Sequence, residues 1–134
     1  MTRYLLDTNH LSYAIRRVSV VRGKIRQHHR KGAKFGTCIP ALCELEIGIR
    51  DTGSIEANHR RLAGVLEMVK VWPLEMSAPS LYAEYYERTT ARGWILDPVD
   101  LYLAVLSTLH GAVLLTADLD FTGLPEVKTE NWQI

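Results

Sequence analysis

The segment Tyr4-Leu5-Leu6-Asp7-Thr8-Asn9 decides the fold class of this chain. Three apolar or aromatic residues in succession, with no polar interruption, predict a short buried strand. Asp7 would then stand at the carboxyl end of that strand, which is the edge of an open α/β sheet where ligands bind. A functional site at this edge would need further acidic side chains from other elements.

A second strand with the same ending lies near the other end of the chain. Ala112 to Thr116 is the strongest strand pattern in the sequence, and Asp118 follows it as Asp7 follows Leu6. If the two strands are neighbours in a parallel sheet, their terminal carboxylates meet. Asp120 is a competing candidate for this position, and a solvated loop position is the alternative for each of these acids taken singly.

The rest of the chain alternates between segments with the pattern of a strand and segments with the pattern of a helix. Further strands are predicted at 35–39, at 71–74 and at 127–132, and Pro73 favours an edge position for the second of these. Helices are predicted after a cap at Asn9, after a cap at Ser19, and over 41–49, 56–70, 77–93 and 97–111. Strands alternating with helices predict an α/β fold, with a parallel sheet covered on both faces.

Length and composition limit the class of protein. With 134 residues, 47% hydrophobic residues and a net charge of +1, the chain is expected to form one soluble domain over residues 1–134. No apolar run is long enough to cross a bilayer and Asp7 interrupts any signal peptide, so we expect a cytoplasmic protein without membrane contact. Cys38 and Cys43 suggest no disulfide framework and are interpreted as small buried apolar residues.

One basic stretch stands out within this balanced composition. Residues 16–34 contain eight Lys and Arg residues and no acid. The stretch is either a solvated helix face or a contact surface for a phosphate backbone or an acidic partner.

Glu44 is the first candidate partner for Asp7. At about 100° per residue, the helix over 41–49 turns Glu44 toward the apolar arc of Ala41, Leu45 and Ile49, and turns Glu46 toward solvent. An inward carboxylate is costly unless it is paired or bound to a cation. Alternatively, Glu44 lies at the margin of the arc and reaches solvent.

Asp97 and Asp100 open the helix that ends at Gly111. Asp97 is interpreted as the N-cap, with Pro98 at the first helical position, and Asp100 then occupies the third position, where a negative charge suits the helix dipole. Capping alone explains both residues. A carboxylate in this first turn can also face the sheet edge that carries Asp7.

The convergence of Asp7, Glu44, Asp100 and Asp118 would determine the chemistry. Clustered carboxylates repel one another, so they either take up protons or bind a hard cation. A set of oxygen ligands suits Mg²⁺ or Mn²⁺ rather than zinc. Such an ion held by carboxylates typically orients a phosphate and activates a water, so the pattern favours metal-dependent hydrolysis of phosphodiesters.

Four groups of residues, in order along the chain, resemble the motifs of one family. They are Leu5 to Asn9; Ala41 to Leu45 with Gly48; Gly93, Ile95 or Leu96, Asp100, Leu103 and Ala104; and Leu115 to Asp118 with Asp120, Phe121, Asn131 and Trp132. The ordered set resembles PIN-domain ribonucleases, and in particular the VapC-type toxins of bacterial toxin–antitoxin modules. The resemblance runs nearly from end to end.

This resemblance implies a three-layer α/β/α sandwich with a central, mainly parallel sheet and an acidic pocket that holds Mg²⁺ or Mn²⁺. It also implies an RNA substrate, a homodimer, and an antitoxin whose tail blocks the pocket. The implied carboxylates are Asp7, Glu44, Asp100 and Asp118, and the implied polar helpers are Thr116 and Asn9. Asp97 departs from the family pattern, and is either an outer contact of the site or only the helix cap.

The function predicted from the sequence is a metal-dependent endoribonuclease of the toxin type. One alternative is a binding module that keeps the fold without catalysis. A second alternative is a receiver-like phosphoacceptor domain, which would need paired acids after the first strand, whereas Thr8 and Asn9 follow Asp7.

The remaining aromatic and histidine residues receive structural interpretations. The five histidines lack metal-ligand spacing. Tyr82, Tyr85 and Tyr86 are expected in the core and in dimer contacts rather than in a base-stacking platform. Trp132 is expected to hold the C-terminal strand in place.

Overall fold

A parallel five-stranded sheet forms the centre of the protein. The computed structural model describes residues 1–93 and 96–134, and within them the strand order is β3-β2-β1-β4-β5 with every neighbouring pair parallel. The strands are β1 (Arg3–Leu6), β2 (Lys34–Thr37), β3 (Val69–Val71), β4 (Val113–Leu115) and β5 (Thr129–Glu130). The predicted α/β fold with a parallel sheet is therefore confirmed.

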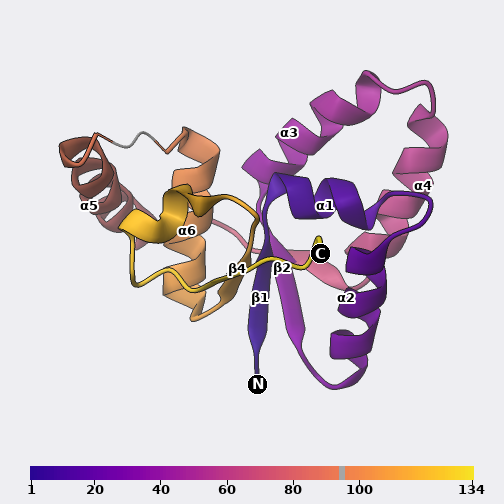
Figure 1. Ribbon diagram of the computed structural model, residues 1–134, viewed down its shortest axis with the longest axis horizontal. Helices are drawn as coiled ribbons and strands as arrows, with labels where there is room; N and C mark the ends of the chain where they lie inside the picture. Colours follow the sequence, from indigo (N-terminus) through magenta and orange to yellow (C-terminus); the bar gives the residue numbers. More distant parts are fainter. Residues whose placement is uncertain (94–95) are drawn as a thin grey trace.

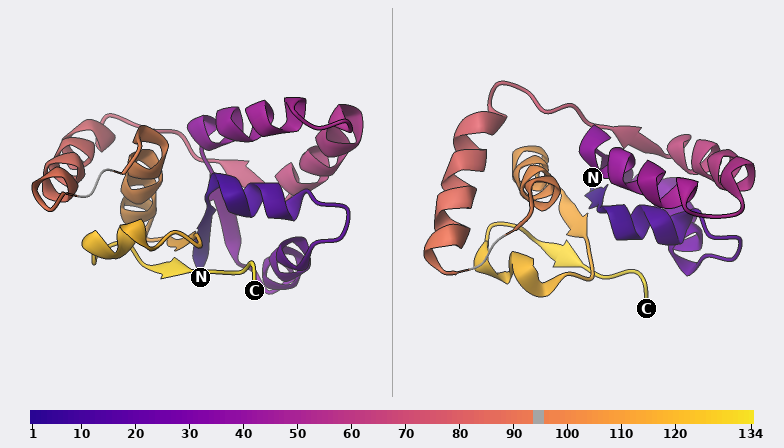
Figure 2. Two further views of the ribbon diagram at one scale, coloured as in Figure 1. Left: turned by 45° about the horizontal axis from the view of Figure 1, so that its top comes forward. Right: turned by 90° about the horizontal axis from the view of Figure 1, so that it is seen from above.

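Helices cover both faces of this sheet (Figure 1 and Figure 2). On one side lie α1 (Thr8–Ala14), α2 (Val20–Arg30), α3 (Ile39–Arg50) and α4 (Ile55–Leu66). On the other side lie α6 (Pro98–His110) and, packed outside it, α5 (Ala78–Ala91), while a 3₁₀ helix η1 (Leu119–Gly123) links β4 to β5. The predicted three-layer α/β/α arrangement is confirmed. None of the helices in the described ranges combines the length and apolarity needed to traverse a bilayer.

The order of the strands creates a switch point beside β1. From β1 the chain proceeds to β2 and β3 in one direction, and it then returns to place β4 on the opposite side of β1. Helices on the two connections consequently lie on opposite faces, which leaves a crevice at the carboxyl ends of β1 and β4. Leu5, Leu6, Leu114 and Leu115 are completely buried and fix these two strands in the core.

Most predicted helix ends are confirmed. Ser19 accepts the backbone N–H of Arg22 at 3.0 Å, and Asp97 accepts that of Asp100 at 2.9 Å, so both are N-caps. Gly111 ends α6 with φ of 60°, a left-handed conformation that favours glycine.

The predicted cap at Asn9 is wrong, because the helix begins earlier. Asp7 is the N-cap of α1, and its Oδ1 accepts the backbone N–H of His10 at 2.7 Å. The strand ends at Leu6. Asp7 follows with an extended backbone and a side chain that can accept a hydrogen bond, so it meets the requirements of an N-cap before Asn9 does.

Several element boundaries also differ from the prediction. The helix predicted over 56–70 ends at Leu66, because Val69 pairs with Phe35 and begins β3. The strand predicted over 71–74 lies earlier in the chain, since β3 runs from Val69 to Val71, and it is an edge strand as predicted. The strand predicted over 127–132 is reduced to Thr129–Glu130. Ile95, one of the two alternatives in the third motif, lies outside the described residues.

Trp132 leaves the sheet and enters the core. Its ring lies 4.8 Å from the Tyr4 ring and 4.6 Å from the His28 ring, between centroids, and its indole N–H donates to Glu130. The prediction that Trp132 holds the C-terminal segment in place is confirmed, although the residue lies beyond β5.

The tyrosines of α5 and the two cysteines each include buried and exposed residues. Tyr85 is fully buried, and its hydroxyl lies 2.8 Å from Thr108 Oγ1, whereas Tyr86 is exposed. Cys38 is buried as expected, but the prediction is wrong for Cys43, which is exposed. Cys43 lies outside the buried stripe of α3, because residues at intervals of four form that stripe.

Gly36 lies at a close approach between β2 and an aromatic ring. The ring of Trp72 covers Gly36, and a Cβ at position 36 would overlap ring carbons Cδ2 and Cε2 and lie 2.6 Å from Cε3. The same ring stacks on His110, with centroids 4.5 Å apart. Glycine is therefore required at this position by packing rather than by backbone conformation.

Candidate functional site

The carboxyl ends of β1 and β4 bring the two strand-end acids together. The strands are hydrogen-bonded neighbours with Leu6 opposite Leu115, and the backbone N–H of Asp7 donates to the Leu115 carbonyl at 3.2 Å. Asp118 follows three residues after β4 and lines the same pocket as Asp7. This pocket lies at the switch point of the sheet, where α/β folds bind ligands.

Five carboxylates line this pocket, which we call the acid pocket. It has a volume of about 280 Å³, and its lining residues are Asp7, Thr8, Asn9, Glu44, Asp97, Asp100 and Asp118. The acids come from the ends of β1 and β4, from α3 and from the start of α6. No basic side chain is among these lining residues, so the mutual repulsion of the carboxylates is uncompensated within the pocket lining.

Asp100 carries the electrostatic consequence of this arrangement. Its pKa is raised from an ordinary value of 3.8 to about 7, first because the carboxyl is removed from water and then because four other acids surround it. These acids, in decreasing order of effect, are Asp97, Asp118, Asp7 and Glu44. The pKa of Asp100 thus lies close to neutral pH, so this carboxyl can hold a proton when no cation is present.

The raised pKa predicts how stability depends on pH in EDTA. The folded pKa of Asp100 lies above the unfolded value, so its contribution to stability is complete at low pH and is lost as the pH rises to about 7. Asp100→Asn should therefore stabilise the fold relative to wild type by an amount that grows between about pH 4.5 and about pH 8. Thermal unfolding of both proteins across this range measures the difference, and a constant or shrinking difference would contradict the assignment.

Asp7 is held by a histidine that the sequence analysis interpreted as structural. His10 is completely buried, and its Nδ1 lies 3.0 Å from Asp7 Oδ1, which also accepts the His10 backbone N–H. His10 Nε2 in turn accepts the backbone N–H of Trp132 at 3.1 Å. Metal-ligand spacing could not reveal this residue, since its partners are a carboxylate on the preceding turn and a segment distant in the sequence.

Glu44 reaches the acid pocket, but not as an inward residue. The prediction that it is turned inward is wrong, because its side chain is exposed at the pocket rim, where Oε1 accepts a hydrogen bond from Thr8 Oγ1 at 2.8 Å. Glu46 is half-buried rather than solvated, and its carboxylate lies 2.9 Å from His59 Nε2 and 3.4 Å from Arg50 Nε. The apolar arc of α3 is thus narrower than the sequence pattern indicated.

The turn after β4 brings Asp118 into the acid pocket and leaves the competing candidate Asp120 outside it. Thr116 is buried, and its Oγ1 accepts the backbone N–H of Asp118 at 3.0 Å. Asp118 Oδ1 accepts the backbone N–H of Asp120 at 2.8 Å. Asp118 and Asp97 line the pocket, whereas Asp120 and Thr116 are outside its lining residues.

The chemistry of the donors determines which ion the acid pocket suits. Carboxylate oxygens are the ligands of hard divalent cations such as Mg²⁺ and Mn²⁺. Across residues 1–93 and 96–134, no three His, Cys, Asp or Glu side chains are arranged so that they could hold a metal ion together. Four of the five pocket carboxylates instead accept hydrogen bonds from nearby groups of the protein, namely Asp7, Glu44, Asp97 and Asp118. The five carboxylates of the lining and the raised pKa of Asp100 fit a cation by donor type and charge.

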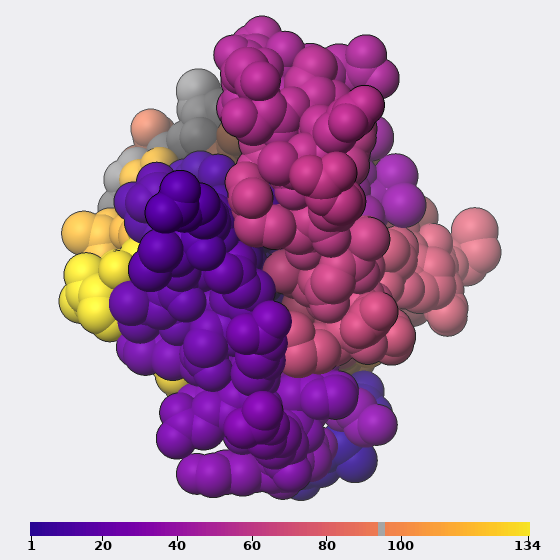
Figure 3. All heavy atoms as spheres, turned by 90° about the vertical axis from the view of Figure 1, so that its right-hand side faces the viewer, coloured from indigo at the N-terminus to yellow at the C-terminus, as the bar shows by residue number. Residues whose placement is uncertain are grey.

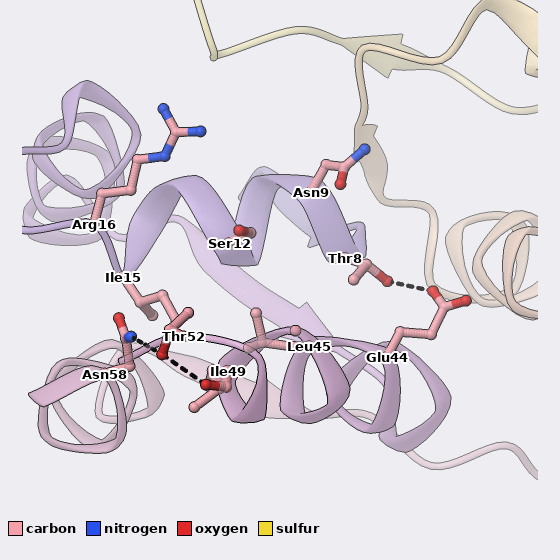
Figure 4. A pocket seen from close by; sticks show the side chains of 11 residues that line it. Thr8, Asn9, Ser12, Ile15, Arg16, Glu44, Leu45, Ile49, Thr52 and Asn58 are labelled. Carbon is pink, nitrogen blue, oxygen red and sulfur yellow. Dashed lines mark hydrogen bonds between the residues drawn. The ribbon is translucent and has the colours of Figure 1, made fainter. Parts of the chain in front are cut away.

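A second hollow, which we call the α1–α3 groove, continues from the acid pocket. It has a volume of about 360 Å³ and shares Thr8, Asn9 and Glu44 with the acid pocket. Figure 4 shows Glu44 at one end and Arg16 at the other, with Ser12 between them on α1. Figure 3 shows the face of the molecule on which α1 and α2 lie beside α4.

The basic stretch over residues 16–34 divides into two groups. Arg22 donates to the carbonyl oxygens of Ala14 at 2.7 Å and Arg17 at 3.0 Å, and Lys24 donates to the Ile134 carbonyl at 3.1 Å, so these two cations hold the fold. The other six cations are exposed, namely Arg16, Arg17, Arg26, Arg30, Lys31 and Lys34. These six exposed cations lie on α2 and in the segments that flank it, and we call them together the basic surface.

Comparisons with known proteins agree with this fold over nearly its full length. The sequence model of the PIN domain matches residues 4–127. Ribonuclease VapC2 of Rickettsia felis is 25% identical over 130 residues, which cover 96% of this chain and 97% of that protein. Ribonuclease VapC4 of Mycobacterium tuberculosis is 25% identical over 99 residues, which cover 72% of this chain and 76% of that protein. The crystal structure of VapBC2 from Rickettsia felis, bound to a DNA fragment from its promoter, superimposes with a TM-score of 0.85 at 23% identity and covers 98% of this chain and 99% of that chain.

Proposed function

This chain belongs to the PIN domain family, and we propose that it is a metal-dependent endoribonuclease, the toxin of a toxin–antitoxin module. The observation that carries the proposal is the acid pocket, where carboxylates from four elements meet at the switch point of the sheet. Two relatives that bear the name ribonuclease VapC support the same reaction class.

Asp7, Glu44, Asp100 and Asp118 are the residues that would hold Mg²⁺ or Mn²⁺. When bound, such an ion supplies Lewis-acid stabilisation of charge on phosphate oxygens and lowers the pKa of the attacking water. Asp100 holds a proton near neutral pH in the absence of a cation and would lose it when a positive charge enters the pocket. The proposed site therefore releases protons on metal binding.

Two polar residues would support these carboxylates. Thr116 fixes the backbone of Asp118 through the hydrogen bond to its N–H, and so sets where that carboxylate stands. Asn9 lines both the acid pocket and the α1–α3 groove, where its amide can donate to a phosphate oxygen or to a water. Asp97 lines the pocket and caps α6, which supports a role as an outer contact that keeps Asp100 protonated.

The surroundings of the acid pocket support RNA as the substrate. The α1–α3 groove would hold the strand next to the cleaved phosphodiester, because it opens from the acid pocket and leads to Arg16. The exposed cations of the basic surface can attract a phosphate backbone despite the net charge of only +1.

Two protein partners belong to this proposal. An antitoxin segment would cover the acid pocket, in keeping with the similarity to VapBC2, whose structure was solved as a VapBC complex. A second copy of the chain would cover exposed apolar side chains along α5, namely Leu74 and Met76 just before the helix and Tyr86 within it.

One observation favours a second candidate, a PIN-fold module that binds without cleaving. The carboxylates of Asp7, Glu44 and Asp118 each accept a hydrogen bond from the protein, and no ready-made metal ligand group exists in the described part of the chain. A binding module would need no such group.

Cleavage of RNA by the purified, antitoxin-free protein separates the two candidates. With Mg²⁺ or Mn²⁺, the proposed enzyme cuts structured RNAs, and EDTA in excess of the metal stops cleavage until metal is restored. Folded protein that leaves several structured RNAs intact at saturating Mn²⁺ would support the binding module. Cleavage that continues in EDTA would contradict a metal-dependent mechanism.

A further inference from the structure

We infer that His10 is a positioning residue for Asp7, and that the backbone N–H of Trp132, in the C-terminal segment 131–134, fixes which ring nitrogen of His10 donates to that carboxylate. The inference rests on the proposed function, since it assigns Asp7 to the metal site. His10 is not a lining residue of the acid pocket or of the α1–α3 groove. It acts on the acid pocket through the carboxylate of Asp7.

First, the hydrogen-bond partners of His10 decide which ring nitrogen of its imidazole carries the proton. The backbone N–H of Trp132 can only donate, so His10 Nε2 must be the unprotonated acceptor at 3.1 Å. The proton of the neutral ring then sits on Nδ1, which donates to Asp7 Oδ1 at 3.0 Å. Gln133 Nε2 also lies 3.2 Å from Nδ1, but a ring nitrogen that carries a proton does not accept from it.

The Trp132 contact prevails because of burial. Trp132 is buried, and a buried backbone N–H without a partner loses its hydrogen bonds to water with nothing in return. The side chain of Gln133 is only partly buried and can bond to water instead. The backbone of the C-terminal segment thus sets the tautomer of His10.

The second step is the effect on Asp7. Oδ1 accepts two hydrogen bonds, one from the His10 backbone at 2.7 Å and one from the His10 ring at 3.0 Å. These two donors fix the plane of a carboxylate whose side chain is only 10% exposed. In the described part of the chain Oδ2 accepts no hydrogen bond, which leaves this oxygen of Asp7 for a ligand in the acid pocket.

The third step is the anchoring of the C-terminal segment itself. The Trp132 ring packs against Tyr4 of β1 and His28 of α2, and Lys24 of α2 donates to the Ile134 carbonyl. Figure 1 shows the C-terminal end beside α1 and α2. The segment is therefore fixed to the core, which keeps the Trp132 backbone N–H in place to donate to His10 Nε2.

Two substitutions separate the two hydrogen bonds of His10. In His10→Asn the amide NH₂ replaces Nδ1 and can still donate to Asp7, but nothing reaches Trp132. In His10→Gln the longer side chain places its amide where Nε2 lay, so the oxygen can accept from Trp132 while the bond to Asp7 is lost. Both variants keep the backbone N–H that caps α1.

The readout is binding of Mn²⁺ to the full chain without RNA, measured by electron paramagnetic resonance. We expect His10→Gln to bind Mn²⁺ about 10- to 100-fold more weakly than wild type, the range typical when a residue that orients a ligand is removed. His10→Asn should recover most of this loss, even if its unfolding temperature is the lower of the two. A merely structural role would instead make the loss of affinity follow the loss of stability.

The outcomes separate this inference from the proposed function. Equal Mn²⁺ affinity in wild type and His10→Gln would overturn the inference whether or not RNA is cleaved. Weaker Mn²⁺ binding by the His10→Asn variant than by the His10→Gln variant would overturn it as well. Wild type that binds no Mn²⁺ would overturn both. The expected split in Mn²⁺ affinity without RNA cleavage would sustain the inference and reject the enzyme. Ring-nitrogen chemical shifts of His10 provide an independent check, since protonation on Nε2 would contradict the argument.

Discussion

Asp7→Asn is expected to lower the rate of metal-dependent RNA cleavage by about a thousand-fold. A metal ion supplies several kcal/mol of charge stabilisation in the transition state, and a loss of about 4 kcal/mol corresponds to this factor. The substitution removes one negative charge from the acid pocket while keeping the shape of the side chain. Single-turnover cleavage of one RNA at fixed Mn²⁺ measures the effect.

The structure makes this variant a clean test, because the fold should survive it. The asparagine oxygen can still accept the His10 backbone N–H and cap α1, since Asn and Asp are comparable N-caps. Asp120→Asn is the matched control: it removes a nearby exposed carboxylate that does not line the acid pocket, and it should cleave like wild type. Wild-type rates in Asp7→Asn would show that the chemistry lies elsewhere or that another nuclease is present.

Gly36→Ala is expected to have the largest effect on stability, a loss of about 3 kcal/mol or more. Overpacking a well-packed core costs about 1–3 kcal/mol and occasionally more. Here the added Cβ would overlap the ring of Trp72, which is itself held by stacking on His110. The free energy of unfolding in urea measures the change.

A second glycine provides the control for this prediction. Gly64 lies inside α4, and a Cβ there would meet nothing within 4 Å. Gly64→Ala should stabilise the protein by about 0.5–1 kcal/mol, because alanine loses less conformational entropy in a helix. If Gly36→Ala were as harmless as Gly64→Ala, the Trp72 ring would have room to move, and the packing described for β2 would be wrong.

The sheet could be predicted from the sequence because its two inner strands carry the signal locally. The runs ending at Leu6 and Leu115 are uninterrupted and apolar, which is typical of strands buried on both faces. The order of strands and helices then determines the parallel connections and the switch point. Asp7 and Asp118 could be placed at one sheet edge for this reason alone.

The surroundings of these acids depended on packing that no local pattern contains. The helical period turned Glu44 toward the apolar arc of α3, but Glu44 is exposed and accepts a hydrogen bond from Thr8 of α1, which the pattern of α3 alone could not show. The choice between Asp118 and Asp120 depended on the tight turn that Thr116 and Asp118 stabilise. Asp97 entered the pocket lining because the cap of α6 lies at the sheet edge.

The role inferred for His10 could not be predicted from the spacing of residues along the sequence. Its second partner, Trp132, is 122 residues away in the sequence and contacts it through a backbone N–H, which has no residue signature. The predicted strand over 127–132 also concealed this contact, because a paired strand would have used the same N–H within the sheet.

If the chain is a metal-dependent ribonuclease, the acid pocket holds its catalytic cation. Anomalous diffraction from crystals soaked in Mn²⁺ locates manganese without reference to activity. We expect a manganese peak about 2–2.5 Å from an oxygen of Asp7 and from at least one of Glu44, Asp100 and Asp118. An acid pocket without a manganese peak at saturating Mn²⁺, in crystals where these side chains are well ordered, would contradict it.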